Sequence, residues 1–215
     1  IFFLDCGSNY GFYSFFTASL SKKNKVLAYE ASKSTTEEFR KNQLLNDFKN
    51  INCKNLAISN EYNKIIELYE STNDWESSIN HSSFNKKKIS KIKTTTIDFE
   101  LKDYDLKDFV LCVKLDIEGS EFDAIKGAKE TIKEYNPIFI IEISKYNINK
   151  MNSNLKFFTE FLLENDYLII DLYQNKVEIS EIKKRLTDVD KDHKTIGNFY
   201  LVKNNHYLDF FSSNE

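Results

Sequence analysis

Asp5-Cys6-Gly7-Ser8-Asn9-Tyr10-Gly11 links an apolar run over residues 1–4 to a segment whose apolar side chains recur at helical spacing. The run is typical of a buried strand, and the spacing predicts a helix that begins near residue 12. The chain holds only five glycines, and two of them, Gly7 and Gly11, lie in this stretch. Because glycine is needed where a side chain does not fit, we interpret the stretch as a turn at a ligand site, although a plain strand-to-helix turn has the same pattern.

The alternation of strand and helix continues along the chain. Residues 26–29 and 53–58 predict two more strands, and Ser34-Thr35-Thr36-Glu37 matches a capping box that opens a helix between them. Strands at 65–69 and 89–97 predict a strand-rich insertion over about 60–98, in which we expect the polar residues 73–85 to form a mobile loop. The remaining predicted elements are strands over 109–115, 138–141, 167–173 and 198–202, a helix carrying Phe122, Ile125 and Ile132, and a helix over 155–163. This order predicts a single α/β domain over residues 1–215 with a largely parallel sheet.

Composition argues against several classes of function. The formal net charge is −3, with both signs interspersed, so bulk attraction to nucleic acid or to an anionic membrane is not expected. The apolar runs are far shorter than the about 20 residues of a membrane span. Scattered cysteines, Cys6, Cys53 and Cys112, are typical of reduced thiols and a cytoplasmic location. Because residue 1 is not Met and already lies in a strand, we expect a further segment before it.

Acidic residues at strand ends indicate a nucleoside ligand that also carries an amino acid. Helix N–H groups after the first turn suit a carboxylate and Asp5 suits an ammonium, and S-adenosylmethionine carries both groups. A pyrophosphate would be repelled by Asp5, and the G-x-G-x-x-G spacing is absent. Glu30, at the end of the second strand, is placed to accept hydrogen bonds from ribose hydroxyls. Ala57 and Ile58 would lie beside the adenine, although packing at a strand edge explains that pair equally well.

Seven short motifs then follow one another in a characteristic order. They are Asp5-Cys6-Gly7-Ser8-Asn9-Tyr10-Gly11, Tyr29-Glu30, Asn55-Leu56-Ala57-Ile58-Ser59, Thr94-Thr95-Thr96-Ile97-Asp98, Lys114-Leu115-Asp116-Ile117-Glu118-Gly119-Ser120-Glu121, Lys126-Gly127-Ala128 and Ile140-Ile141-Glu142-Ile143. The set resembles the FkbM-type methyltransferase family over about residues 1–145, and more weakly near Phe199-Tyr200-Leu201. The K-x-D-x-E-G-x-E block, with K-G-A after it, is the most specific part of the resemblance.

The resemblance implies a class I, Rossmann-like fold: a mostly parallel seven-stranded sheet with an antiparallel closing strand and helices on both faces. It also implies S-adenosylmethionine at the carboxyl edge and O-methylation of a hydroxyl on a sugar, glycan or natural product. The expected cofactor contacts are Asp5, Gly7, Ser8, Asn9, Gly11, Glu30, Ala31, Ala57, Ile58 and Asp116. Cys6 stands where a small aliphatic residue is usual, Ala31 where a proline often follows the acid, and Ser144 where a histidine is often seen.

Methyl transfer to a hydroxyl needs an aligned acceptor and a group that removes its proton. Asp116, Glu118 and Glu142 are the candidate catalytic residues, but Glu118 suits a structural role in the Gly119 turn equally well. The three acids are also a candidate site for a divalent cation, which the sequence does not decide. One of Tyr10, Phe12 and Tyr13 is a candidate to face the sulfonium, although we expect Phe12 in the core. The candidate acceptor contacts lie in the polar loop and are Trp75, Ser77, Ser78 and His81, with His81 also an alternative base.

Two other classes of function stay open at this point. A nicotinamide-dependent oxidoreductase would use a similar sheet, but the glycine spacing and the acid in the first turn disfavour it. A non-catalytic methyltransferase-like interaction domain is disfavoured by the intact acids and glycines. The expected partner is a small-molecule or glycan acceptor, and the sequence does not indicate an oligomeric state.

Overall fold

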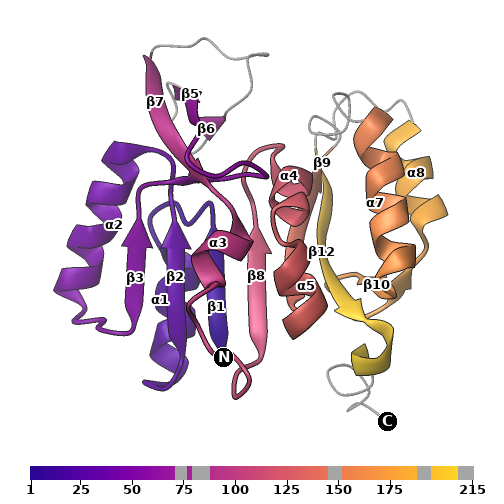
Figure 1. Ribbon diagram of the computed structural model, residues 1–215, viewed down its shortest axis with the longest axis horizontal. Helices are drawn as coiled ribbons and strands as arrows, with labels where there is room; N and C mark the ends of the chain where they lie inside the picture. The colour runs from indigo at the N-terminus through magenta and orange to yellow at the C-terminus, as the bar shows by residue number, and fades with distance from the viewer. Residues whose placement is uncertain (71–76, 79–87, 145–151, 188–194, 208–215) are drawn as a thin grey trace.

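The main sheet of the protein has eight strands in the order β11-β10-β12-β9-β8-β1-β2-β3 (Figure 1). The computed structural model describes residues 1–70, 77–78, 88–144, 152–187 and 195–207. The strands are β1 (Phe2–Cys6), β2 (Lys25–Tyr29), β3 (Ile51–Lys54), β8 (Leu111–Leu115), β9 (Ile138–Ser144), β10 (Tyr167–Ile170), β11 (Lys176–Val177) and β12 (Thr195–Lys203). Within the described residues the sheet therefore has one strand more than the seven expected, because the two-residue β11 pairs with β10.

Strand direction matches the expected topology. The pairs β3-β2, β2-β1, β1-β8 and β8-β9 are parallel, whereas β12 is antiparallel to both β9 and β10. Figure 1 shows β1, β2, β3 and β8 pointing to one edge and β12 pointing the opposite way. The carboxyl ends of the parallel strands therefore meet at a single edge, which is where ligands bind in open α/β sheets.

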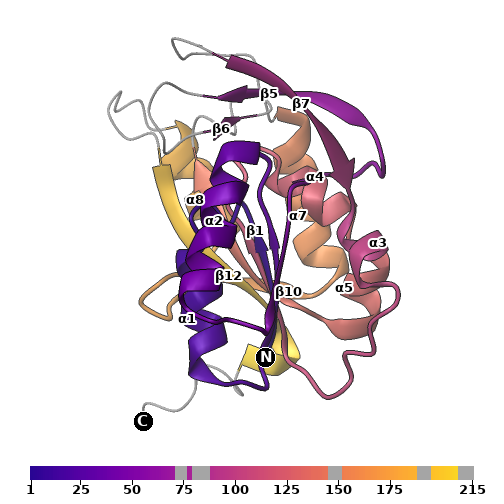
Figure 2. The same ribbon diagram turned by 90° about the vertical axis from the view of Figure 1, so that its left-hand side faces the viewer.

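Helices cover both faces of this sheet, as the alternation of elements predicts. One face carries α1 (Phe12–Leu20) and α2 (Lys33–Leu45), and Figure 2 shows α3, α4 and α5 on the opposite side. The remaining helices are α3 (Ile97–Leu101), α4 (Glu121–Lys126), α5 (Lys129–Tyr135), α7 (Asn152–Glu164), α8 (Ile179–Thr187) and the 3-10 helix η1 (Asn204–His206). The single helix expected around Phe122 and Ile132 is two helices, because the chain turns at Gly127 and Ala128.

Two local expectations need correction. The helix α2 begins earlier than the capping box indicated, because the side chain of Ser32 accepts a hydrogen bond from the Thr35 N–H and acts as the N-cap. The strand expected over 53–58 is divided: β3 ends at Lys54, and β4 (Ala57–Ile58) belongs to a second sheet. Between them the side-chain amide of Asn55 donates to the carbonyl oxygens of Glu30 and Ala31, each at 2.9 Å, and turns the chain.

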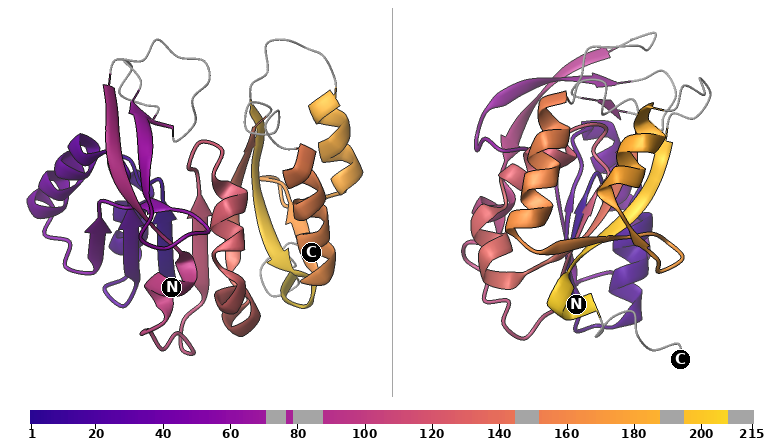
Figure 3. Two further views of the ribbon diagram at one scale, coloured as in Figure 1. Left: turned by 45° about the horizontal axis from the view of Figure 1, so that its top comes forward. Right: turned by 90° about the vertical axis from the view of Figure 1, so that its right-hand side faces the viewer.

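The second sheet stands over the carboxyl edge of the main sheet (Figure 1 and the left view of Figure 3). Its strands β4, β5 (Ile65–Glu70), β6 (Ser77–Ser78) and β7 (Lys88–Thr95) occur in the order β4-β7-β5-β6. The strands expected at 65–69 and 89–97 are confirmed as β5 and β7. Most of the polar loop predicted at 73–85 lies outside the described residues.

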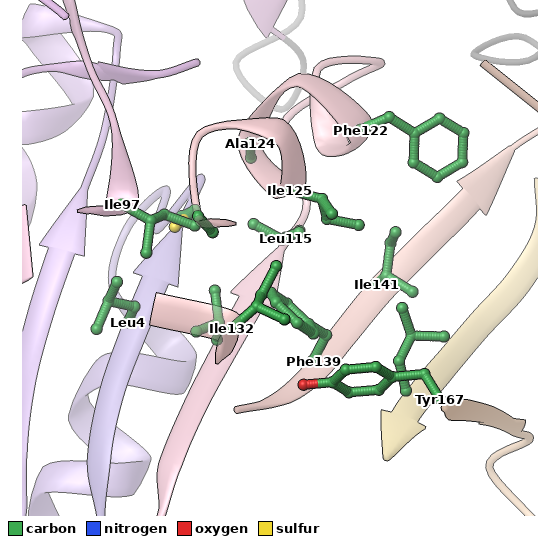
Figure 4. Close-up of a cluster of buried hydrophobic side chains, with 14 of the residues drawn as sticks. Leu4, Ile97, Leu115, Phe122, Ala124, Ile125, Ile132, Phe139, Ile141 and Tyr167 are labelled. Carbon is green, nitrogen blue, oxygen red and sulfur yellow. The ribbon is translucent and has the colours of Figure 1, made fainter. Parts of the chain in front are cut away.

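The larger hydrophobic cluster fills the face under α4, α5 and α7 (Figure 4). It joins sheet residues such as Leu4, Phe139 and Ile141 to Phe122 and Ile125 of α4, all of them buried. No helix in the described ranges is long and apolar enough to cross a membrane.

The helix α1 packs through Ser14, Ala18 and the half-buried Phe15, and its other aromatic side chains are exposed. Ser14 and Ala18 are buried, whereas Phe12 is 76% exposed and Phe16 is 57% exposed, so the expected core position of Phe12 is wrong. The hydroxyl of Ser14 donates to Asp5 Oδ2 at 2.6 Å. Because a buried carboxylate needs a donor, this bond turns the polar side of α1 toward the sheet.

Candidate functional site

A pocket opens at the carboxyl edge, where the turns after β1, β2 and β8 meet the second sheet. It is lined by Gly7, Asn9, Tyr29, Glu30, Ala31, Thr35, Leu56, Ala57, Ile58, Leu68, Asp116, Ile117 and Glu118. Of the predicted cofactor residues, seven lie in this lining and three, Asp5, Ser8 and Gly11, do not. The expected crevice at the ends of parallel strands is therefore present, with the glycine turn and Glu30 on its wall.

Gly7 allows two of these turns to touch. Its φ is +78°, and a Cβ at this position would collide with the carbonyl oxygen of Asp116. The Asp116 N–H donates to the carbonyl oxygen of Cys6 at 3.2 Å, so a backbone hydrogen bond also joins the two turns. Gly11 also has a positive φ, of +95°, but a Cβ there would meet the rings of Phe15 and Phe39. Gly11 is thus required for packing, and Gly7 for the approach of the β8 turn.

Glu30 ties the first turn to the second. Its Oε2 accepts from the Asn9 N–H at 2.9 Å, and its Oε1 accepts from the Ser32 N–H at 2.8 Å. Burial raises the pKa of this carboxyl, and the two backbone donors oppose that rise. A carboxylate has about four lone-pair positions, so these two bonds leave Glu30 able to accept further hydrogen bonds from a ligand in the pocket.

The wall beyond Glu30 is apolar. Leu56, Ala57 and Ile58 come from the segment after β3, and Leu68 comes from β5 of the second sheet. Ala57 and Ile58 also pair with β7 in the second sheet, and their contact with the adenine stays a prediction. Leu68 was not predicted as a site residue, because only the tertiary arrangement brings β5 to this edge.

A buried ion-pair group lies behind the glycine turn. Lys114 Nζ is 3.0 Å from Asp116 Oδ2 and 3.6 Å from Asp5 Oδ1, and it donates to the Gly7 carbonyl at 3.3 Å. The Asp5 side chain is only 1% exposed, so this acid faces Lys114 and Ser14. Burial raises the pKa of Asp5, against the opposing effects of Lys114 and Ser14. Lys114 is the first residue of the K-x-D-x-E-G-x-E block, but no role was predicted for it from the sequence.

A family model described as a methyltransferase FkbM domain matches residues 5–169. The chain belongs to the FkbM methyltransferase family. S-adenosylmethionine is the methyl donor of this family. The nicotinamide-dependent alternative is therefore set aside for this FkbM domain.

The FkbM domain is similar to several solved structures, and one of them has a TM-score above 0.5. The crystal structure of methyltransferase FkbM from Methylobacillus flagellatus KT has a TM-score of 0.55 and 19% identity, and the match covers 93% of this chain and 42% of that one. An rRNA methylase from Streptococcus thermophilus has a TM-score of 0.47 and 12% identity, over 94% and 86% of the two chains. A proposed methyltransferase from Streptococcus mutans in complex with SAH has a TM-score of 0.47 and 11% identity, over 93% and 85%. The chain thus spans less than half the length of the M. flagellatus protein. No match was found among curated proteins.

Polar atoms in the glycine turn of the FkbM domain fit the amino-acid end of this donor. Ser8 Oγ and Asn9 Oδ1 are buried and have no hydrogen-bond partner among the described residues. A buried polar atom without a partner is costly, and a bound ammonium would supply the missing donor. The turn therefore suits the methionine end of the donor, while Glu30 suits its ribose.

Of the three candidate acids of the FkbM domain, two line the pocket. Asp116 and Glu118 line the pocket, whereas Glu142, on β9, does not. No group of three or more His, Cys, Asp or Glu side chains in the described ranges is placed to hold a metal ion. The arrangement of three acids around a divalent cation therefore has no geometric support in this part of the chain.

Glu121 takes the structural role that was considered for Glu118. Its Oε1 accepts from the N–H groups of Ile117 and Gly119, at 3.0 and 3.2 Å, and so holds the turn after β8. Burial raises the pKa of Glu121 to about 7, against these backbone donors. One feature of the sequence could have indicated this role: Glu121, the last acid of the K-x-D-x-E-G-x-E block, follows Gly119 by two residues.

The predicted acceptor contacts stay mostly untested by the structure of the FkbM domain. Trp75 and His81 lie outside the described residues, and Ser77 and Ser78 form the short strand β6. Phe12 and Tyr13, by contrast, are exposed at the start of α1, and their rings meet edge to face at 5.4 Å. The Tyr13 ring centre is 5.2 Å from the Nζ of Lys114, which is the ion-pair partner of Asp116.

Proposed function

We propose that this FkbM domain transfers the methyl group of S-adenosylmethionine to a hydroxyl of a sugar, glycan or other natural product. The observation that carries the proposal is one pocket whose wall holds both Glu30, at the end of β2, and Asp116, after β8, with Gly7 between them. Because both acids line one pocket, a single extended ligand there can contact both. The chain spans less than half the length of the M. flagellatus protein, so methyl transfer by the whole protein is also part of this proposal.

Different residues of the chain contact three parts of the donor: the ribose, the adenine and the amino-acid end. Glu30 accepts hydrogen bonds from the ribose, and Leu56, Ile58 and Leu68 form the apolar surface for the adenine. Asn9, which lines the pocket and has an unpaired Oδ1, holds the amino-acid end, and the unpaired Ser8 Oγ lies next to it in the chain. When bound, the donor supplies an electrophilic methyl group on a positively charged sulfur.

Asp116 is the proposed proton acceptor. Its side chain is 43% exposed at the pocket, and Lys114 holds one of its oxygens at 3.0 Å. A general base must lie within hydrogen-bond reach of the acceptor hydroxyl, and a half-exposed acid on the pocket wall is accessible to such a hydroxyl. Glu118, on the same wall, is the second candidate, and Glu142 remains a prediction from the sequence alone.

The aromatic pair of Phe12 and Tyr13 supports a sugar-like acceptor. Phe12 is 76% exposed and Tyr13 is 49% exposed, so two exposed aromatic faces lie at the start of α1, with Tyr13 near Lys114, the ion-pair partner of Asp116. Aromatic rings present large apolar faces, on which the C–H faces of a sugar ring can stack. The cytoplasmic location and the absence of a nucleic-acid partner stay predictions from the sequence.

The test is binding followed by transfer. Calorimetry with S-adenosylhomocysteine should show binding, and NAD should show none. Transfer of a labelled methyl group should then be measured across hydroxylated saccharides, with Asp116→Asn as the inactive control. A chain that binds neither S-adenosylmethionine nor S-adenosylhomocysteine would contradict the proposal and favour the non-catalytic interaction domain.

A further inference from the structure

We propose that Lys114 is a positioning residue that joins Asp5 and Asp116 into one charged unit and so sets the charge at the methyl-donor pocket. The inference rests on the proposed use of S-adenosylmethionine. It concerns two residues, Lys114 and Asp5, that do not line the described pocket themselves. They act on a ligand through Asp116, which does line it.

The distances and burial form a graded series from the interior to the pocket. The side chain of Asp5 is 1% exposed, that of Lys114 is 6% exposed, and that of Asp116 is 43% exposed. Lys114 Nζ lies between the two acids, 3.6 Å from Asp5 Oδ1 and 3.0 Å from Asp116 Oδ2. Charges at these separations interact strongly where water is excluded. The charge of Asp5 therefore affects Asp116 through Lys114.

Two uncharged groups also orient the side chain of Lys114. Its ammonium donates to the Gly7 carbonyl at 3.3 Å and lies 5.2 Å from the centre of the Tyr13 ring. Gly7 belongs to the turn that the donor is proposed to contact. The same cation therefore holds the glycine turn and the carboxylate of Asp116 in one geometry.

The charged surroundings keep the ammonium protonated. Burial by itself lowers the pKa of Lys114, but the carboxylates of Asp5 and Asp116 outweigh it and raise the pKa above its usual value. The titratable groups that face Lys114 are Asp5 and Cys6 of β1, Glu30 after β2, Tyr13 of α1 and Asp116 after β8. With both acids ionised, the unit of Asp5, Lys114 and Asp116 carries one negative charge.

This charge count makes the inference measurable without a known acceptor. S-adenosylmethionine and S-adenosylhomocysteine share their adenosine and amino-acid ends and differ in the methyl group and in the charge on sulfur. The ratio of their affinities therefore isolates the charge at the pocket. Lys114→Met removes the positive charge next to Asp116, and the buried Asp5, left without its cation, takes up a proton, so Asp116 is the one negative charge that remains. Asp5→Asn leaves Lys114 and Asp116 as a neutral pair, and the double variant again leaves Asp116 as the only charge of the unit.

The experiment is calorimetry of both ligands on the wild type, the two single variants and the double variant. We expect Lys114→Met to shift the affinity ratio at least about fivefold toward S-adenosylmethionine, and Asp5→Asn at least about fivefold toward S-adenosylhomocysteine. The double variant should match Lys114→Met to within about twofold, because Asp116 is the only charge of the unit in both. Ser14→Ala is the matched control, because it removes a hydrogen bond from Asp5 and no charge.

A purely structural role for Lys114 predicts a different outcome, in which both affinities fall together and the ratio stays constant. A ratio within about twofold of the wild type in folded Lys114→Met and Asp5→Asn would overturn the proposal. If Lys114→Met does not fold, Asp5→Asn and the double variant decide: a shift in the first that is reversed in the second supports the proposal, and any other pair of results overturns it. A wild-type chain that binds neither ligand contradicts the proposed function itself, which is a distinguishable result.

Discussion

Replacement of Glu30 by alanine separates the structural role of this acid from its role in ligand binding. The carboxylate accepts from the N–H groups of Asn9 and Ser32, at 2.9 and 2.8 Å, and alanine offers neither N–H an acceptor. An unsatisfied buried N–H costs about 1–3 kcal/mol. We therefore expect Glu30→Ala to lower the free energy of unfolding of the ligand-free protein by about 2–5 kcal/mol.

The measurement combines urea unfolding, thermal melting and calorimetry. For a chain of this size the expected loss corresponds to a fall in Tm of roughly 5–15 °C. The affinity for S-adenosylhomocysteine should fall at least about tenfold, because the ribose loses its charged acceptor. Glu37→Ala is the matched control: the residue is exposed on α2, so its free energy of unfolding should change by less than about 0.5 kcal/mol.

Glu30→Gln refines the test. It keeps one acceptor oxygen but places an amide N–H₂ against one of the two backbone donors, so its stability should fall between wild type and Glu30→Ala. If Glu30→Ala unfolds at the same urea concentration as the wild type, the two backbone hydrogen bonds do not hold the turns together. The structural part of the reasoning would then be wrong, whatever happens to ligand affinity.

Three further predictions concern the turns around the pocket. Gly7→Ala should lower the free energy of unfolding by at least about 2 kcal/mol in urea unfolding, because the Cβ would collide with the Asp116 carbonyl at a positive φ; stability equal to wild type would contradict that contact. The native carboxyl of Glu121 keeps its proton up to a pKa of about 7, against 4.5 as the ordinary value, so stability should decrease by roughly 3 kcal/mol as pH rises through this window, and Glu121→Gln should flatten the profile. Asp116→Asn should abolish labelled-methyl transfer once an acceptor is found, while S-adenosylhomocysteine affinity stays within about tenfold of the wild type; transfer at the wild-type rate would exclude Asp116 as the base.

The parts of the site that follow from strand order were predictable from the sequence. Glycine is scarce, so its placement at Gly7 after a short apolar run indicated a turn at the carboxyl edge. Glu30 directly follows the second apolar run, and parallel strands bring their carboxyl ends together. These two facts placed Glu30 and Gly7 on one pocket without any knowledge of tertiary contacts.

The contacts that depend on how a helix rotates, or on which chain segments pack together, were not predictable in the same way. Phe12 fits an apolar helical pattern, but the need of buried Asp5 for a donor turns Ser14 inward and leaves Phe12 exposed. Glu118 and Glu121 are both acids near one glycine, and only the geometry of the turn shows that Glu121 holds its N–H groups. Leu68 reaches the pocket from a different sheet, and no local pattern marks that approach.

The turns after β1 and β8 behave as one structural unit, and this has a consequence for catalysis. Three contacts join them: the Asp116 N–H to the Cys6 carbonyl, the close approach of Gly7 to the Asp116 carbonyl, and the Lys114 ammonium to the Gly7 carbonyl. Two of the three are made by backbone atoms alone. In-line methyl transfer requires the donor and the proton acceptor to be aligned closely, and small displacements are costly in rate. A glycine at position 7 allows the turn proposed to hold the donor and the turn carrying the proposed base to be aligned by the main chain, so that their relative position does not depend on the rotamers of the side chains that bind the ligand.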